Sequence, residues 1–134
     1  MSNSQTILEQ NTHASDSAVQ LLTGEKYRGD GFYGRSDGLH TIQIDLSGFI
    51  GHIEIQGTLA VEPVDDDWFS VTMGTGSQSV DTTGLIQEEN INRIEFDHPA
   101  TKVKSYNFTG NYVWVRAKIS NWTDGAVNSI KMNH

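Results

Sequence analysis

Apolar and polar residues alternate in short runs along most of the chain from about residue 19. Two runs, 41–46 and 52–59, alternate with a period of two, which is the pattern of a strand with one buried face. Gly48 and Gly51 lie between them, so the two runs predict a β-hairpin. The apolar positions of this pair are Ile42, Ile44, Leu46, Ile53, Ile55 and Leu59.

Further strands are predicted over residues 68–73, 91–96, 103–108, 112–119 and 126–132. A turn at Thr109–Asn111 predicts that 103–108 and 112–119 pair as a second hairpin. In the strand 112–119 the residues Val113, Val115, Ala117 and Ile119 share one face, and Tyr112, Trp114, Arg116 and Lys118 share the other. The glycine- and serine-rich stretch from Gly74 to about Asn90 carries no strand pattern and is expected to be a loop.

These elements predict an all-β fold. About eight short antiparallel strands with turn signals between them favour a β-sandwich or jelly roll over residues 19–134, with a closed barrel as the alternative. Residues 1–18 are polar, have no sustained period and are predicted to form an extended N-terminal arm outside the core. Ile7 and Leu8 are its two strongly apolar residues and could dock onto a partner.

Length and composition restrict the choice of function. A chain of 134 residues is expected to build one domain, and no apolar run is long enough to cross a membrane as a helix. The first residues show no secretory signal pattern, and the absence of cysteine excludes disulfides and thiolate ligands. The net charge of −8 makes direct nucleic-acid binding a poor expectation. We therefore expect a soluble protein held together by packing or by assembly.

The acidic run Asp65, Asp66 and Asp67 is the sharpest local motif. Clustered carboxylates can bind Ca²⁺, but the run lacks the glycine and the distal glutamate of an EF-hand loop. A solvated turn before Trp68 is therefore favoured, and the three aspartates remain only weak candidates for a metal site. No cofactor is predicted.

The sequence predicts no enzymatic activity. It contains neither HExxH nor GxSxG, and its five histidines are scattered. Asp45 and Glu54 could form a glycosidase pair only if both faced a cleft, whereas alternation places them on the polar face of their strands.

Exposed aromatic side chains are the remaining candidates for binding. Phe32 and Tyr33 lie in a glycine-rich stretch, Trp114 projects opposite the apolar stripe of its strand, and Trp122 falls in the loop that follows. Such residues can stack on a sugar or fill a partner's pocket, or they can pack inside the protein.

Several short motifs resemble one family. They are Asp37–Thr41, Phe49–Gly51, Gln56–Leu59, Pro63, Asp67–Phe69 and Phe108–Ala117. Over about residues 25–134 the chain is similar to small β-sandwich virion structural proteins of tailed bacteriophages, especially T4-like and cyanobacterial phages. The resemblance implies a sandwich with an assembly role and carries over no catalytic residue.

Two functions follow as hypotheses. The first is a structural protein of the virion, attached to capsid, neck or tail through its arm and a sheet edge, whose partners are other virion proteins and copies of itself. The alternative is a carbohydrate- or receptor-binding module of a tail fibre or baseplate. In that case Phe32, Tyr33, Trp68, Trp114 and Trp122 would supply the stacking surfaces.

Overall fold

The computed structural model describes residues 4–13, 21–34, 38–80 and 86–133, and within 75–90 it describes backbone pairing only. The all-β class is confirmed, because the described residues form ten antiparallel strands and two short 3₁₀ turns. None of their helices is long and apolar enough to cross a membrane. The elements are β1 (Gln5–Leu8), β2 (Asn11–His13), β3 (Leu22–Thr23), β4 (Tyr27–Arg28), η1 (Asp30–Tyr33), β5 (Leu39–Thr58), η2 (Asp65–Asp67), β6 (Phe69–Ser70), β7 (Met73–Val80), β8 (Ile86–Ile91), β9 (Ile94–Thr109) and β10 (Trp114–Asn133).

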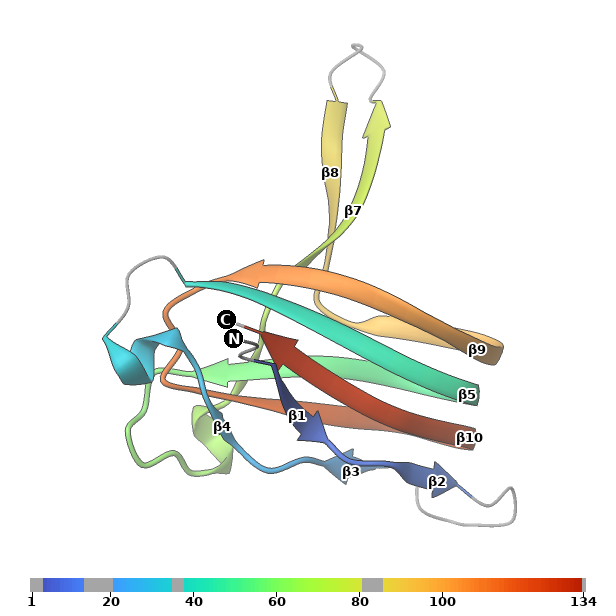
Figure 1. The fold of residues 1–134 in the computed structure, drawn as a ribbon, viewed down its shortest axis with the longest axis horizontal. Helices are drawn as coiled ribbons and strands as arrows, with labels where there is room; N and C mark the ends of the chain where they lie inside the picture. Colours follow the sequence, from blue (N-terminus) through green and yellow to red (C-terminus); the bar gives the residue numbers. More distant parts are fainter. Residues whose placement is uncertain (1–3, 14–20, 35–37, 81–85, 134) are drawn as a thin grey trace.

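Three long strands, β10, β5 and β9, lie side by side and build the centre of the sheet. Each of them bends back near its middle, so a single sheet folds over into two stacked layers (Figure 1). The bends coincide with register shifts in the pairing of β5 with β10 and β9. Bulges of this kind increase local twist and let a strand pass from one layer to the other.

The predicted hairpin between 41–46 and 52–59 is wrong. Both runs belong to the one strand β5, and neither pairs with the other. β10 flanks β5 along both halves, and β9 and then β6 pair on its other side. Gly48 has φ 63° and Gly51 has φ 156°, which turn the strand into the opposite layer without a tight reversal. The glycines correctly marked the position where the backbone bends. Glycines occur at a corner of a folded sheet as they do in a hairpin turn, so the sequence did not distinguish the two.

The second predicted hairpin is also corrected. β9 and β10 are not neighbours, because β5 lies between them, and residues 110–113 connect one layer to the other. The stretch from Gly74 to Asn90, expected to be a loop, contains β7 and β8, which pair with each other. The residues of this stretch have weak strand propensity, and the interstrand hydrogen bonds between β7 and β8 stabilise their extended conformation.

Smaller boundaries shift as well. The predicted strand 68–73 is reduced to β6 and the start of β7, although the Val71 N–H still donates to the Ile55 carbonyl at 2.9 Å. The predicted strand 91–96 is divided between the end of β8 and the start of β9.

The N-terminal segment belongs to the sheet. β1 and β2 pair with the second half of β10, and β3 and β4 pair with its first half, so together they border β10 across both layers. Ile7 and Leu8 are 1% and 7% exposed and join the core cluster. The expectation that residues 1–18 lie outside the core is thus corrected for Gln5–His13. This polar segment forms edge strands because the backbone groups of β10 on that side are available for pairing.

The core lies between the two layers. Ile42, Ile44, Leu46, Ile53, Ile55, Val115, Ala117 and Ile119 are each at most 1% exposed, as their alternation predicts. Full burial of one such aliphatic side chain stabilises the fold by about 1.5–3 kcal/mol. Leu59, by contrast, is 65% exposed because β5 ends at Thr58.

Candidate functional site

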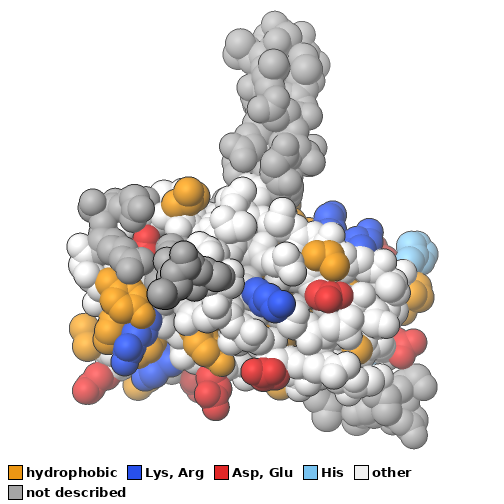
Figure 2. All heavy atoms as spheres, in the orientation of Figure 1, with side chains coloured by type: hydrophobic (Ala, Val, Ile, Leu, Met, Phe, Trp, Pro, Cys, Tyr) orange, Lys and Arg blue, Asp and Glu red, His pale blue; other side chains and the backbone are white. Residues whose placement is uncertain are grey.

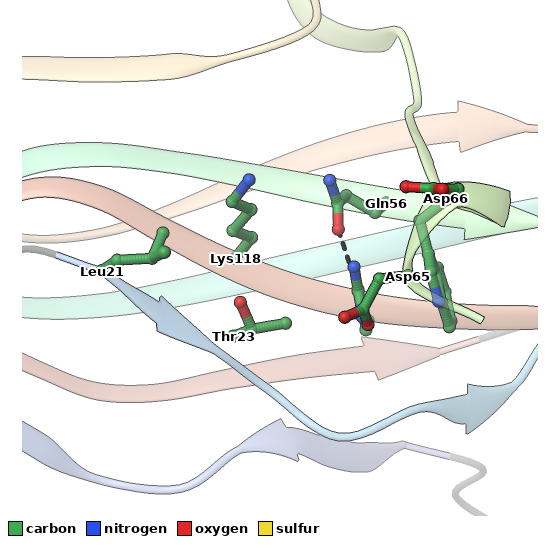
Figure 3. Close-up of a pocket in the computed structure, with 8 residues that line it drawn as sticks. Leu21, Thr23, Gln56, Asp65, Asp66 and Lys118 are labelled. Atoms are coloured by element: carbon green, nitrogen blue, oxygen red, sulfur yellow. Dashed lines mark hydrogen bonds and ion pairs between the residues drawn. The ribbon is translucent and has the colours of Figure 1, made fainter. Parts of the chain in front are cut away.

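A groove of about 570 Å³ lies on the outer face of the layer built by β3, the first half of β10 and the second half of β5. Figure 3 shows Thr23, Lys118 and Gln56 rising from these strands, with Asp65 and Asp66 arriving from η2. The strand pairing fixes this arrangement, because Lys118 is opposite Thr23 on one side of β10 and Arg116 is opposite Gln56 on the other.

Arg116 organises one end of the groove. Its Nε donates a hydrogen bond to Gln56 Oε1 at 2.8 Å, and its guanidinium carbon lies 4.3 Å from the centre of the Trp68 ring. Arg116 Nη1 lies 3.9 Å from Asp65 Oδ1. The Asp65 side chain is fully exposed, so this ion pair contributes little to stability. Burial lowers the pKa of the Arg116 guanidinium, and the charge of Asp65 partly opposes this shift.

The three aspartates at 65–67 do not point to one centre. Asp67 Oδ2 accepts a hydrogen bond from the Val64 backbone N–H at 2.9 Å, which caps the turn η2. Asp65 and Asp66 line the groove instead. Within the described part of the chain, no three acidic or histidine side chains are arranged to hold a metal ion.

A cluster of aromatic and basic side chains lies at the end of the molecule formed by η1 and β4. Phe32 contacts Tyr33 and Trp114, with ring centres 5.5 Å and 5.1 Å apart. Lys26 Nζ lies 4.6 Å from the Trp114 ring and the Arg28 guanidinium 4.5 Å from the Phe32 ring. Figure 2 shows hydrophobic side chains beside basic ones at this end of the protein. Three of the predicted partner-binding residues are therefore brought together, and the two cations are an addition that the sequence did not indicate.

Trp122 lies elsewhere, although it was predicted as part of the same binding surface. Its side chain is 4% exposed and packs against His13 and Phe49 at ring-centre distances of 5.2 Å and 6.3 Å. Like Ile7 and Leu8, it is a core residue. Alternation cannot place it, because the irregular pairing of β10 after Ser120 changes which side chains face inward.

The groove was not predicted from the sequence, although the sequence carries one sign of it. Alternation had placed Trp114, Arg116 and Lys118 on one face of their strand. Gln56, Asp65 and Asp66 come from segments far away in the sequence, and the pairing of β10 with β5 brings Gln56 beside Arg116.

Comparison with known proteins gives a fold relationship. No family model matches the chain, and no curated protein matches its sequence. Among solved structures, the SPBc2 prophage-derived protein YomS is similar with a TM-score of 0.52 at 12% identity, over 96% of this chain and 88% of that chain. At this identity the likeness shows a shared fold only. A Clostridium thermocellum xylanase with a CBM22-1 and a GH10 module gives a TM-score of 0.35 at 8% identity, over 98% of this chain and 26% of that chain, which is too low to indicate a common fold.

Proposed function

We propose that this chain is a non-enzymatic structural protein of a tailed-phage virion, attached to capsid, neck or tail. The β7–β8 hairpin carries the proposal. Beyond Gly74, which is opposite Asn107 of β9, the strands of the hairpin pair with each other, and Figure 1 shows them leaving the two layers. A two-stranded hairpin is marginally stable by itself in water, so a neighbouring protein surface would stabilise it.

The outer edge of β9 supports the same function. Within the described residues this edge pairs at one position, Asn107 with Gly74, which leaves backbone groups for another strand. Lys102 and Lys104 are exposed along it. Two copies of this edge would bring lysines together, so the charge favours a different, acidic partner strand. The fold shared with YomS, a prophage-derived protein, agrees with a phage origin.

Removal of the hairpin tests this function. In the variant, Asn-Gly replaces residues 75–89, a turn that suits two antiparallel strands. We expect the variant to keep the β-sheet circular dichroism spectrum and cooperative thermal unfolding of the wild type, and to be absent from purified particles of the phage that encodes it. Val64→Ser, a change at an exposed position away from the hairpin, is the control and should be incorporated normally. Normal incorporation of the hairpin variant, or absence of the wild-type chain from particles, would contradict the proposal.

A second candidate function is binding of a carbohydrate or a host receptor. The groove beside Trp68 favours it, because a volume of about 570 Å³ lined mainly by polar side chains, with Leu21 and one aromatic ring, suits a small polar ligand. Titration of the isolated protein with oligosaccharides tests this function independently of particle assembly.

A further inference from the structure

Arg116 fixes the direction of one hydrogen-bond donor in the groove, the side-chain amide of Gln56. Arginine can only donate, so the atom of Gln56 that faces Arg116 Nε at 2.8 Å is the amide oxygen. The amide NH₂ of Gln56 must therefore point the other way. Figure 3 shows this NH₂ and the Lys118 ammonium pointing in the same direction. Gln56 is 8% exposed, which makes it a rigid donor.

The charges of the groove are arranged in two levels. Arg116 and Lys118 are two residues apart on β10, so their side chains leave the same face of the strand about 7 Å apart. Lys118 forms no ion pair with any described residue. Asp65 and Asp66 belong to η2, above the strands, and are exposed. Glu54 of β5 is opposite Lys118 in the register but forms no ion pair with it. The floor thus offers two cations and the Gln56 amide beside this one carboxylate, while the rim offers acceptors and negative charge.

This arrangement selects among ligand classes. Floor donors match a carboxylate, and rim carboxylates match hydroxyl groups. The half-buried Trp68 ring, which also lines the groove, provides an apolar surface for the C–H face of a sugar ring. A polyphosphate carries no hydroxyl groups, so it would leave the rim aspartates without hydrogen-bond donors. A molecule that carries many hydroxyls and a carboxylate satisfies both levels.

We propose that this groove binds an acidic saccharide, an oligosaccharide that contains hexuronate. Its carboxylate accepts hydrogen bonds from the Lys118 ammonium and the Gln56 amide, its hydroxyls donate to Asp65 and Asp66, and a ring packs against Trp68. This assignment rests on the second function proposed above and names its ligand class.

Calorimetric titration with a matched pair of probes tests the proposal. The probes are tetragalacturonate and its carboxyl-reduced, neutral counterpart, and tetraglutamate serves as an acidic peptide. We expect tetragalacturonate to bind at least about tenfold more tightly than either of the other two. The neutral probe loses the charge-assisted hydrogen bond to Lys118, and tetraglutamate loses the hydroxyl groups that face Asp65 and Asp66 and the ring that packs on Trp68. Lys118→Ala and Trp68→Ala should each weaken its binding about tenfold or more. Lys131→Ala removes the same charge from the same strand in the other layer and should leave binding unchanged.

The outcomes separate the two levels of the proposal. If neither oligosaccharide binds, the carbohydrate-binding function itself fails. If the neutral probe binds as tightly as the acidic one, that function stands and the carboxylate assignment is overturned. Equal binding of tetraglutamate overturns the assignment to a saccharide. Equal losses in Lys118→Ala and Lys131→Ala show non-specific charge attraction and also overturn the site.

Discussion

Gly125 of β10 lies against Gly48 of β5 at the corner where the sheet folds over. Gly125 has φ 82° and Gly48 has φ 63°, which are backbone conformations that residues other than glycine rarely adopt. A Cβ placed on Gly125 would lie 2.6 Å from the backbone nitrogen of Phe49 and closer still to the Gly48 carbonyl oxygen. A Cβ on Gly48 would meet no atom within 4 Å. Both corner glycines thus have a positive φ, but only at Gly125 would a side chain also collide with the backbone of β5.

This difference predicts unequal costs of two alanine substitutions. Gly48→Ala should lower the free energy of unfolding by about 1–2 kcal/mol, the cost of a left-handed backbone with a side chain. Gly125→Ala should lower it by about 3 kcal/mol or more, because backbone atoms of β5 must also move. Urea unfolding followed by tryptophan fluorescence measures both. Equal losses in the two variants would contradict the close approach at this corner.

Trp122 is expected to affect stability and not binding. Trp122→Ala should cost about 3–5 kcal/mol, because it leaves a cavity beside Phe49. The Trp122 indole N–H has no hydrogen-bond acceptor among the described residues, so Trp122→Phe removes an unsatisfied donor and should cost less than about 1.5 kcal/mol. Thermal unfolding of the two variants measures this order. A loss of saccharide binding in a fully folded Trp122→Phe protein would show that the ring serves the site.

The buried tyrosine of β9 predicts loss of stability at alkaline pH. Tyr106 is 3% exposed, and burial raises the pKa of its hydroxyl above the ordinary 10.0. The neutral form is therefore favoured in the folded protein. Its contribution is complete below about pH 10 and is lost as the pH rises through the folded pKa, with a slope of at most about 1.4 kcal/mol per pH unit. Tyr106→Phe should flatten the decline in unfolding free energy above pH 10, and the variant of the exposed Tyr33, Tyr33→Phe, should not. An unchanged decline in Tyr106→Phe would contradict this origin.

Lys102 and Lys104 are expected to protect the outer edge of β9. In the register they are opposite Leu46 and Ile44, at positions where an apolar side chain would extend the core, yet both are exposed. Inward-placed charge on an edge strand opposes pairing between identical edges. Replacement of both by Val should increase aggregation during refolding, measured by light scattering. Lys131→Val, on a strand paired on both sides, should leave the scattering at the wild-type level. Equal scattering from the double variant and the wild type would argue against a protective role.

The candidate site was only partly accessible from the sequence. Alternation placed Trp114, Arg116 and Lys118 on one strand face, and a glycine-rich stretch identified Phe32 and Tyr33 as candidates for exposure. The hydrogen bond from Arg116 to Gln56, which fixes the amide direction, joins residues 60 positions apart. A period of two reports which side of its own strand a residue faces, and it carries no information about the strand beside it.

The sequence by itself determined the all-β class, the buried faces of the central strands and the positions where the backbone must turn. These are local properties, since alternation and glycine act over a few residues. The tertiary structure decided what each turn does. At Gly48, Gly51 and Gly125 the chain passes into a second layer instead of reversing beside itself, because the long neighbouring strands supply the hydrogen bonds that a hairpin partner would have supplied. The same pairing with β10 drew Ile7 and Leu8 into the core and set Gln56 beside Arg116.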